Sequence, residues 1–143
     1  MPEKRAQRMR ILGVDPGGRR IGLAVSDELG IIARGIDTFD IAAGVDFLVY
    51  VSGLVGSYGI GEIVVGDPVH LSGRVGESSE KARALAAKLQ SRFKLPVTLW
   101  DERLSSEEAR RVLRGSKPNK GVVDKLAAVI ILQSYLDYRR KEA

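Results

Sequence analysis

A chain of 143 residues, of which 44% are hydrophobic and 29% charged, suits one globular domain and excludes a disordered or fibrous protein. The net charge of +5 is compatible with a polyanionic partner such as nucleic acid, although many basic proteins bind no polyanion. No apolar stretch approaches the roughly 20 residues of a membrane span, and the polar start lacks a secretory core, so we expect a cytoplasmic protein with no membrane partner.

The composition also limits metal chemistry. The chain has no cysteine, which excludes disulfides, zinc–thiolate sites and thiol catalysis. Its single histidine, His70, excludes a multi-histidine metal centre. Any bound metal would therefore have oxygen ligands, which favours Mg²⁺ or Mn²⁺.

The predicted elements describe a basic flexible tail at residues 1–8 and one domain at residues 9–143. Strands are expected where apolar and β-branched residues run together, and helices where apolar residues recur with helical spacing. In chain order these are strands at 9–14, 20–26 and 31–36, a helix at 42–58, a strand at 60–66, a helix at 77–93, a strand at 97–100, and helices at 105–114 and 122–140.

Two of the helices carry further signals. A capping box of the type Ser-x-x-Glu opens the helix at 105–114. The helix at 42–58 has an approximately helical register that leaves out Val51 and includes Val45, Leu48, Val49, Leu54 and Val55.

The order of elements predicts the topology. Short connections join the first three strands, which indicates an antiparallel meander. The later strands alternate with helices, which indicates parallel crossovers with helices on both faces of the sheet. We therefore predict an α/β fold with a mixed five-stranded sheet.

Two acids follow predicted strands that should run parallel to each other. Asp15 comes after the strand at 9–14, and Glu102 comes just after the strand at 97–100. Because the carboxyl ends of parallel strands meet at one edge of an open α/β sheet, Asp15 and Glu102 should project from the same edge.

A third acid, Asp124, opens the last predicted helix. It heads an otherwise apolar stripe formed by Ala128, Ile131 and Tyr135, so its face of the helix should point toward the sheet. Carboxylates aimed at one another are costly unless a cation lies between them. A divalent metal bound by all three acids is the simplest interpretation.

Each acid also has a purely structural interpretation. Asp15 could stabilise its turn, Glu102 could be a surface acid, and Asp124 could simply favour a helix N-terminus. Asp67, which follows the strand at 60–66, is either a fourth acid of the set or a turn residue together with the proline after it.

Basic side chains surround the same predicted edge, and guanidinium and ammonium groups bind phosphate oxygens. The candidates for nucleic-acid binding are Arg19, Arg20, Arg74, Arg103, Lys117 and Lys120. His70 either assists proton transfer to a leaving group or is simply solvated. Aromatic residues are only 6% of the chain, so base stacking should not dominate recognition.

This set of residues suits phosphodiester cleavage, in which carboxylate-held divalent ions activate water and stabilise the leaving oxygen. The sequence offers no competing chemistry of the usual kinds. It contains no Ser–His–Asp arrangement with a nucleophile elbow, no P-loop and no dinucleotide-binding fingerprint.

Four segments, at residues 13–27 (GVDPGGRRIGLAVSD), 63–66 (IVVG), 101–105 (DERLS) and 124–137 (DKLAAVIILQSYLD), resemble the bacterial YqgF/RuvX family. The resemblance implies a ribonuclease H-like fold, similarity to Holliday-junction resolvases, and a nuclease that matures the 5′ end of precursor 16S rRNA. It also implies that Asp15, Glu102 and Asp124 are metal-binding catalytic acids. The chain departs from the family's usual pattern at Asp67, where an apolar residue is common, and in the Pro-Gly after Asp15, which is more like the true resolvases.

The leading hypothesis is therefore a metal-dependent endonuclease that acts on structured RNA, with ribosomal precursor particles as a partner. A second hypothesis keeps the site and changes the substrate to a four-way DNA junction, for which a homodimer rather than a monomer is expected. A third is a non-catalytic RNA- or ribosome-binding module, which would need neither metal nor the acids. Nucleotide binding of the actin/hexokinase type usually needs a duplicated domain, which 143 residues do not supply.

Overall fold

The computed structural model describes residues 9–68, 76–102 and 120–142, and in the last helix the side chains from Lys125 onward. The tail expected at 1–8 and the helix expected at 105–114 lie outside the described residues. Among the helices within these ranges, none is long and apolar enough to cross a lipid bilayer.

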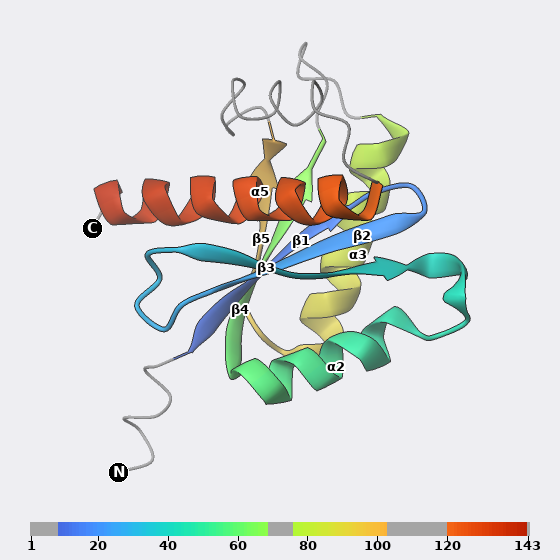
Figure 1. Ribbon diagram of the computed structural model, residues 1–143, viewed down its shortest axis with the longest axis horizontal. Coiled ribbons are helices and arrows are strands. Elements are labelled where there is room, and N and C mark those ends of the chain that lie inside the picture. Colours follow the sequence, from blue (N-terminus) through green and yellow to red (C-terminus); the bar gives the residue numbers. More distant parts are fainter. Residues whose placement is uncertain (1–8, 69–75, 103–119, 143) are drawn as a thin grey trace.

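The sheet has five strands in the order β3-β2-β1-β4-β5 (Figure 1). β2 pairs antiparallel with both β1 and β3, while β4 pairs parallel with β1 and β5 pairs parallel with β4. The predicted mixed sheet, with a meander followed by parallel crossovers, is confirmed. The strands are β1 (Arg10–Pro16), β2 (Arg20–Ser26), β3 (Ala33–Asp40), β4 (Ile60–Asp67) and β5 (Val97–Asp101).

Helices cover both faces of the sheet, as expected from the crossovers. The helix α5 (Lys120–Glu142) crosses one face, whereas α2 (Phe47–Tyr58) and α3 (Glu77–Phe93) pack on the other (Figure 1). The α3 bounds match the prediction, and its buried residues Ala82, Ala86 and Leu89 follow helical spacing.

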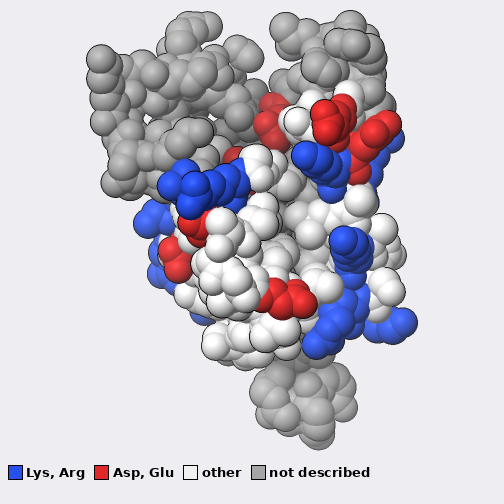
Figure 2. Space-filling view, turned by 90° about the vertical axis from the view of Figure 1, so that its right-hand side faces the viewer, with Lys and Arg blue, Asp and Glu red and all other residues white. Residues whose placement is uncertain are grey.

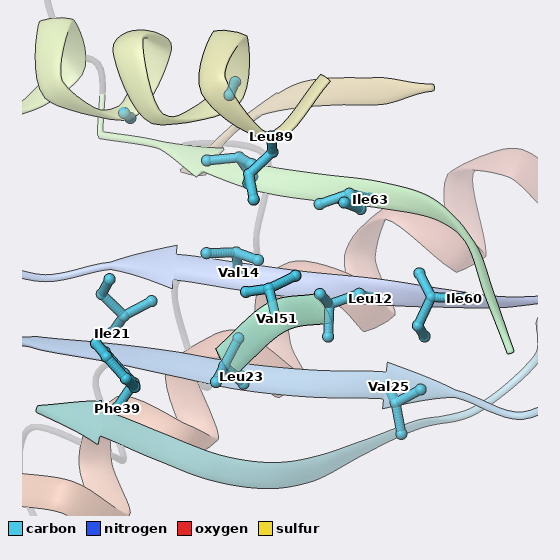
Figure 3. Packing of buried hydrophobic residues seen from close by; sticks show 13 residues of the cluster. Leu12, Val14, Ile21, Leu23, Val25, Phe39, Val51, Ile60, Ile63 and Leu89 are labelled. Atoms are coloured by element: carbon cyan, nitrogen blue, oxygen red, sulfur yellow. The ribbon is translucent and has the colours of Figure 1, made fainter. Parts of the chain in front are cut away.

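The strands divide the core into two layers because successive side chains point to opposite faces. In β1, Leu12 and Val14 pack toward α2 and α3, together with Val51 and Leu89 (Figure 3). Ile11 packs on the other face, in a cluster that includes buried residues of α5. This alternation assigns every later position of β1 to a face.

The prediction of a helix at 42–58 is wrong about where the helix starts and about which of its residues are buried. A short 3-10 helix, η1 (Ile41–Ala43), ends at Gly44, whose positive φ of 83° suits glycine, and α2 begins only after Asp46. The Asp46 carboxylate caps α2 by accepting a hydrogen bond from the Leu48 amide. Val51, which the predicted register left out, is fully buried, whereas Val49 is 61% exposed.

The strand expected at 31–36 also begins later, at Ala33. The Asp27 carboxylate accepts hydrogen bonds from the amides of Ile31 and Ile32, which holds these two residues in a turn. The side chain of Gln133 in α5 then accepts from the Ala33 amide at 2.8 Å and donates to the Ile31 carbonyl. The start of β3 is therefore fixed by a turn acid and by a distant helix.

Candidate active site

Asp15 lies within β1 and not beyond it, since the strand continues to Pro16 and Asp15 pairs with Gly22 of β2. Its side chain lies on the α5 face. Successive side chains of a strand point to opposite faces, and Ile11 and Gly13, at every second position before Asp15, are on that face. Helix α5 passes close there: a Cβ built on Gly13 would lie 2.8 Å from Cβ of Leu132. Asp15 is thus at the carboxyl end of β1, under the layer that α5 forms.

Glu102 follows β5, and its carboxylate lies over β4. A Cβ built on Gly66 would be 3.0 Å from Oε2 of Glu102 and 2.7 Å from Cδ1 of Ile131 in α5. Because Val14 pairs with Val65, the next residues, Asp15 and Gly66, are neighbours on adjacent parallel strands. Asp15 and Glu102 therefore share one face at one edge of the sheet, as the sequence predicts.

The backbone of Asp124 lies in the second turn of α5, and its side chain is outside the described part. Position 124 is seven residues before Ile131, which is two helical turns along the same helix face. Lys125, next to it, packs against β3: a Cβ on Gly35 would be 2.6 Å from Cγ of Lys125. The participation of Asp124 in a shared site stays a prediction.

Asp67 does not join the other acids. It is the last residue of β4, is only 4% exposed, and its side chain is directed to the opposite face of the sheet. There it accepts hydrogen bonds from the Ser79 hydroxyl and, at 3.3 Å, from Nε of Arg83, both in α3. Neither the fourth-acid nor the turn interpretation of Asp67 describes this role, which is to attach α3 to the end of β4.

The donor set fits a hard divalent cation, because carboxylate oxygens are the ligands that Mg²⁺ and Mn²⁺ prefer. Two carboxylates, those of Asp15 and Glu102, lie on one face beside Gly66, where the lack of a side chain leaves room for Glu102. Among the side chains that the structure describes, no group of three acidic or histidine residues is close enough to hold a metal. A third acidic ligand would have to come from outside that part.

Of the basic candidates, the structure describes the side chains of Arg19, the last residue of the connection between β1 and β2, and Arg20, the first residue of β2. Nε of Arg19 lies 3.3 Å from Asp40, in an ion pair in which the Arg19 side chain is 66% exposed. The Ala42 amide, followed by the Arg19 guanidinium, lowers the pKa of Asp40 below its usual value. Such an exposed ion pair is weak, so Arg19 can exchange Asp40 for a phosphate.

The remaining basic candidates are not placed. The backbone of Lys120 begins α5, while Arg74, Arg103, Lys117 and also His70 lie outside the described residues. On the face shown in Figure 2, basic and acidic side chains are interspersed and no single-sign surface forms.

Helix α5 is held in place by polar contacts that sequence reasoning missed. The Tyr135 hydroxyl donates to Glu62 of β4, and Nη1 of Arg139 contacts the same carboxylate at 2.7 Å. Nε1 of Trp100 in β5 donates to the Ser134 hydroxyl at 3.1 Å. Glu62 is an acid on the α5 face of the central strand β4. That placement was the sequence feature that could have indicated a polar partner on the helix that covers this face.

The order of five strands, the antiparallel meander, and the carboxylates at the carboxyl edge under a covering helix define a ribonuclease H-like domain. Solved structures support this fold. Thermus thermophilus RuvC in complex with a Holliday junction substrate matches with a TM-score of 0.58 and 14% identity, covering 92% of this chain and 96% of that chain. The yeast mitochondrial Holliday junction resolvase matches with a TM-score of 0.52 and 13% identity, covering 94% and 80%.

The family follows from sequence comparison. The family model RuvX, described as Holliday junction resolvase, matches residues 9–138, and the chain belongs to this family. A Geobacillus kaustophilus protein named "Putative pre-16S rRNA nuclease" is 45% identical over 138 residues, covering 92% of this chain and 100% of the relative. A Koribacter versatilis protein of the same name is 48% identical, covering 97% and 94%.

Proposed function

We propose that this protein is a divalent-metal-dependent endonuclease that processes the 5′ end of precursor 16S rRNA during ribosome biogenesis. The observation that carries the proposal is the placement of Asp15 and Glu102 on one face at the carboxyl edge of parallel strands. The substrate comes from the names of relatives that match almost the whole chain.

The three acids have separate contributions in this proposal. Asp15 and Glu102, with Asp124 from α5, would hold Mg²⁺ or Mn²⁺ at the sheet edge. When bound, such a cation neutralises charge on the scissile phosphate and lowers the pKa of a water nucleophile. Asp15 comes from a central strand with neighbours on both sides, so its position is rigid and it should orient the reacting phosphate.

Arg19 and Arg20 would bind the nucleic-acid backbone beside that edge. Both lie where the turn that follows Asp15 leads into β2, and a guanidinium can donate two parallel hydrogen bonds to a phosphate. The unplaced candidates Arg74, Arg103, Lys117 and Lys120 would extend the same interaction.

The test compares cleavage of a 5′-extended precursor 16S rRNA by wild type and by Asp15→Asn, with added Mn²⁺. The variant should lose at least about a hundredfold in rate, since it removes one charged ligand and leaves the fold intact. Glu28→Gln is the matched control, because it makes the same carboxylate-to-amide change in the exposed turn after β2. That turn lies at the end of β2 that is far from Asp15, so this variant should cleave like wild type. Undiminished cleavage by Asp15→Asn would rule out the proposed site.

A second candidate function uses the same residues on a four-way DNA junction. It is favoured by the description of the matching family model and by the fold shared with a junction-bound resolvase. The same assay with a synthetic junction decides between the two, and symmetric cleavage by a dimer would favour the junction. Metal-independent RNA binding without cleavage of either substrate would instead favour the non-catalytic module.

A further inference from the structure

We propose that Gly66 is a positioning residue of the active site: its lack of a side chain lets the Glu102 carboxylate lie over β4, next to the strand that carries Asp15. The inference rests on the proposed function, because it concerns the geometry of the proposed metal ligands. It adds a residue that binds nothing itself and acts only through Glu102.

Glycine is not needed at this position for its backbone conformation. The described glycines with positive φ are Gly30, Gly44 and Gly59, and Gly66 is a regular residue of β4 paired with Trp100. What glycine supplies is space on the α5 face. A Cβ there would be 3.0 Å from Oε2 and 3.5 Å from Cγ of Glu102.

The Glu102 oxygen that a Cβ would meet can move. Oε2 is the end of a flexible side chain, so it can withdraw by a few tenths of an ångström with little effect on folding. A magnesium site tolerates such a shift poorly, because Mg²⁺ requires near-octahedral oxygens at about 2.0–2.1 Å. The proposed consequence is a loss of metal affinity that exceeds the loss of stability.

Ile131 complicates the simple variant and also offers the remedy. A Cβ on Gly66 would be 2.7 Å from Cδ1 of Ile131, which is fully buried, so Gly66→Ala alone strains the core. Valine lacks that δ-methyl group. The double variant Gly66→Ala/Ile131→Val therefore relieves the strain under α5 and keeps the steric contact with Glu102.

The experiment measures Mn²⁺ affinity by calorimetry and thermal unfolding without metal, on the whole chain. The variants are Gly66→Ala, Ile131→Val and their combination, with Gly53→Ala as the control because a Cβ there meets nothing within 4 Å. We expect Ile131→Val and Gly53→Ala to keep wild-type affinity. The double variant should unfold at a temperature close to that of Ile131→Val but bind Mn²⁺ at least about tenfold more weakly than wild type. Its kcat should be reduced and its KM for RNA unchanged.

A second cycle tests whether the effect passes through Glu102. In a Glu102→Gln background, adding Gly66→Ala/Ile131→Val should change Mn²⁺ affinity no further, because the carboxylate to be positioned is already absent. Two results would overturn the positioning role of Gly66 without affecting the proposed function. One is wild-type Mn²⁺ affinity in the double variant, and the other is a further loss of affinity when the two substitutions are added to Glu102→Gln. Failure of wild type to bind Mn²⁺, together with full cleavage by Asp15→Asn, would overturn the proposed function as well.

Discussion

The Ser79 hydroxyl donates a hydrogen bond to the Asp67 carboxylate although both residues are shielded from solvent, with Ser79 fully buried and Asp67 4% exposed. Nε of Arg83 completes the arrangement at 3.3 Å from the other carboxylate oxygen. This cluster lies on the α3 face, while Asp15 and Glu102 lie on the α5 face. Acids at one sheet edge thus have different tasks on its two faces.

The first prediction separates these tasks. Asp67→Ala should lower the free energy of unfolding by about 2–3 kcal/mol, because it leaves a buried hydroxyl and a guanidinium without their charged acceptor. Mn²⁺ affinity should stay at the wild-type level, since Asp67 faces away from the proposed ligands. Urea unfolding and Mn²⁺ titration check both parts. A reduction of metal affinity comparable to that of Asp15→Asn would show that Asp67 is a ligand.

The second prediction concerns alkaline pH. Burial, followed by the hydrogen bond to Glu62, raises the pKa of Tyr135 above its ordinary value near 10. The resulting stabilisation is complete at pH values below about 10 and is lost as the pH rises through the raised pKa. Urea unfolding at pH 8 and at about pH 10.5 should show a smaller alkaline loss of stability for Tyr135→Phe than for wild type.

Tyr50 provides the comparison for that experiment. Burial, followed by the charge of Asp37, raises the pKa of Tyr50 too, so Tyr50→Phe should remove a separate share of the alkaline loss of stability. The combined variant should have the flattest profile. An alkaline loss that neither substitution changes would mean that other groups control stability in this range.

The third prediction concerns phosphate binding. Arg19→Ala and Arg20→Ala should each weaken RNA binding measured in EDTA, and each should lower the slope of log affinity against log salt by about 0.7–0.9 for every phosphate that the arginine neutralises. Arg92→Ala, in the last turn of α3, is the matched control and should leave the slope unchanged. Equal slopes for all three variants would place the RNA elsewhere on the protein.

Much of the fold could be predicted because local patterns and burial agree. The bounds of β2 and α3 match the sequence prediction. The buried stripe of Ala128, Ile131 and Tyr135 in α5 also follows from helical spacing. In α3 the buried residues recur with a single helical period, so its register is unambiguous.

The features that could not be predicted depend on contacts between distant segments. The α2 segment has apolar residues on more than one face, so spacing alone could not distinguish buried Val51 from exposed Val49. The role of Asp67 depends on α3 residues that follow an intervening loop. Glu102 was correctly expected at the carboxyl edge, but its position beside Gly66 depends on the pairing of β5 with β4 and on α5, which covers that face.

The most direct test of the proposed metal site is a crystal soaked in Mn²⁺ and measured for anomalous scattering. The proposed site predicts a peak about 2.0–2.3 Å from carboxylate oxygens of both Asp15 and Glu102, with Asp124 as a third ligand, and no such peak in Asp15→Asn. Ordered carboxylates at this edge with no peak between them, or a peak bound by Asp67 instead, would contradict it.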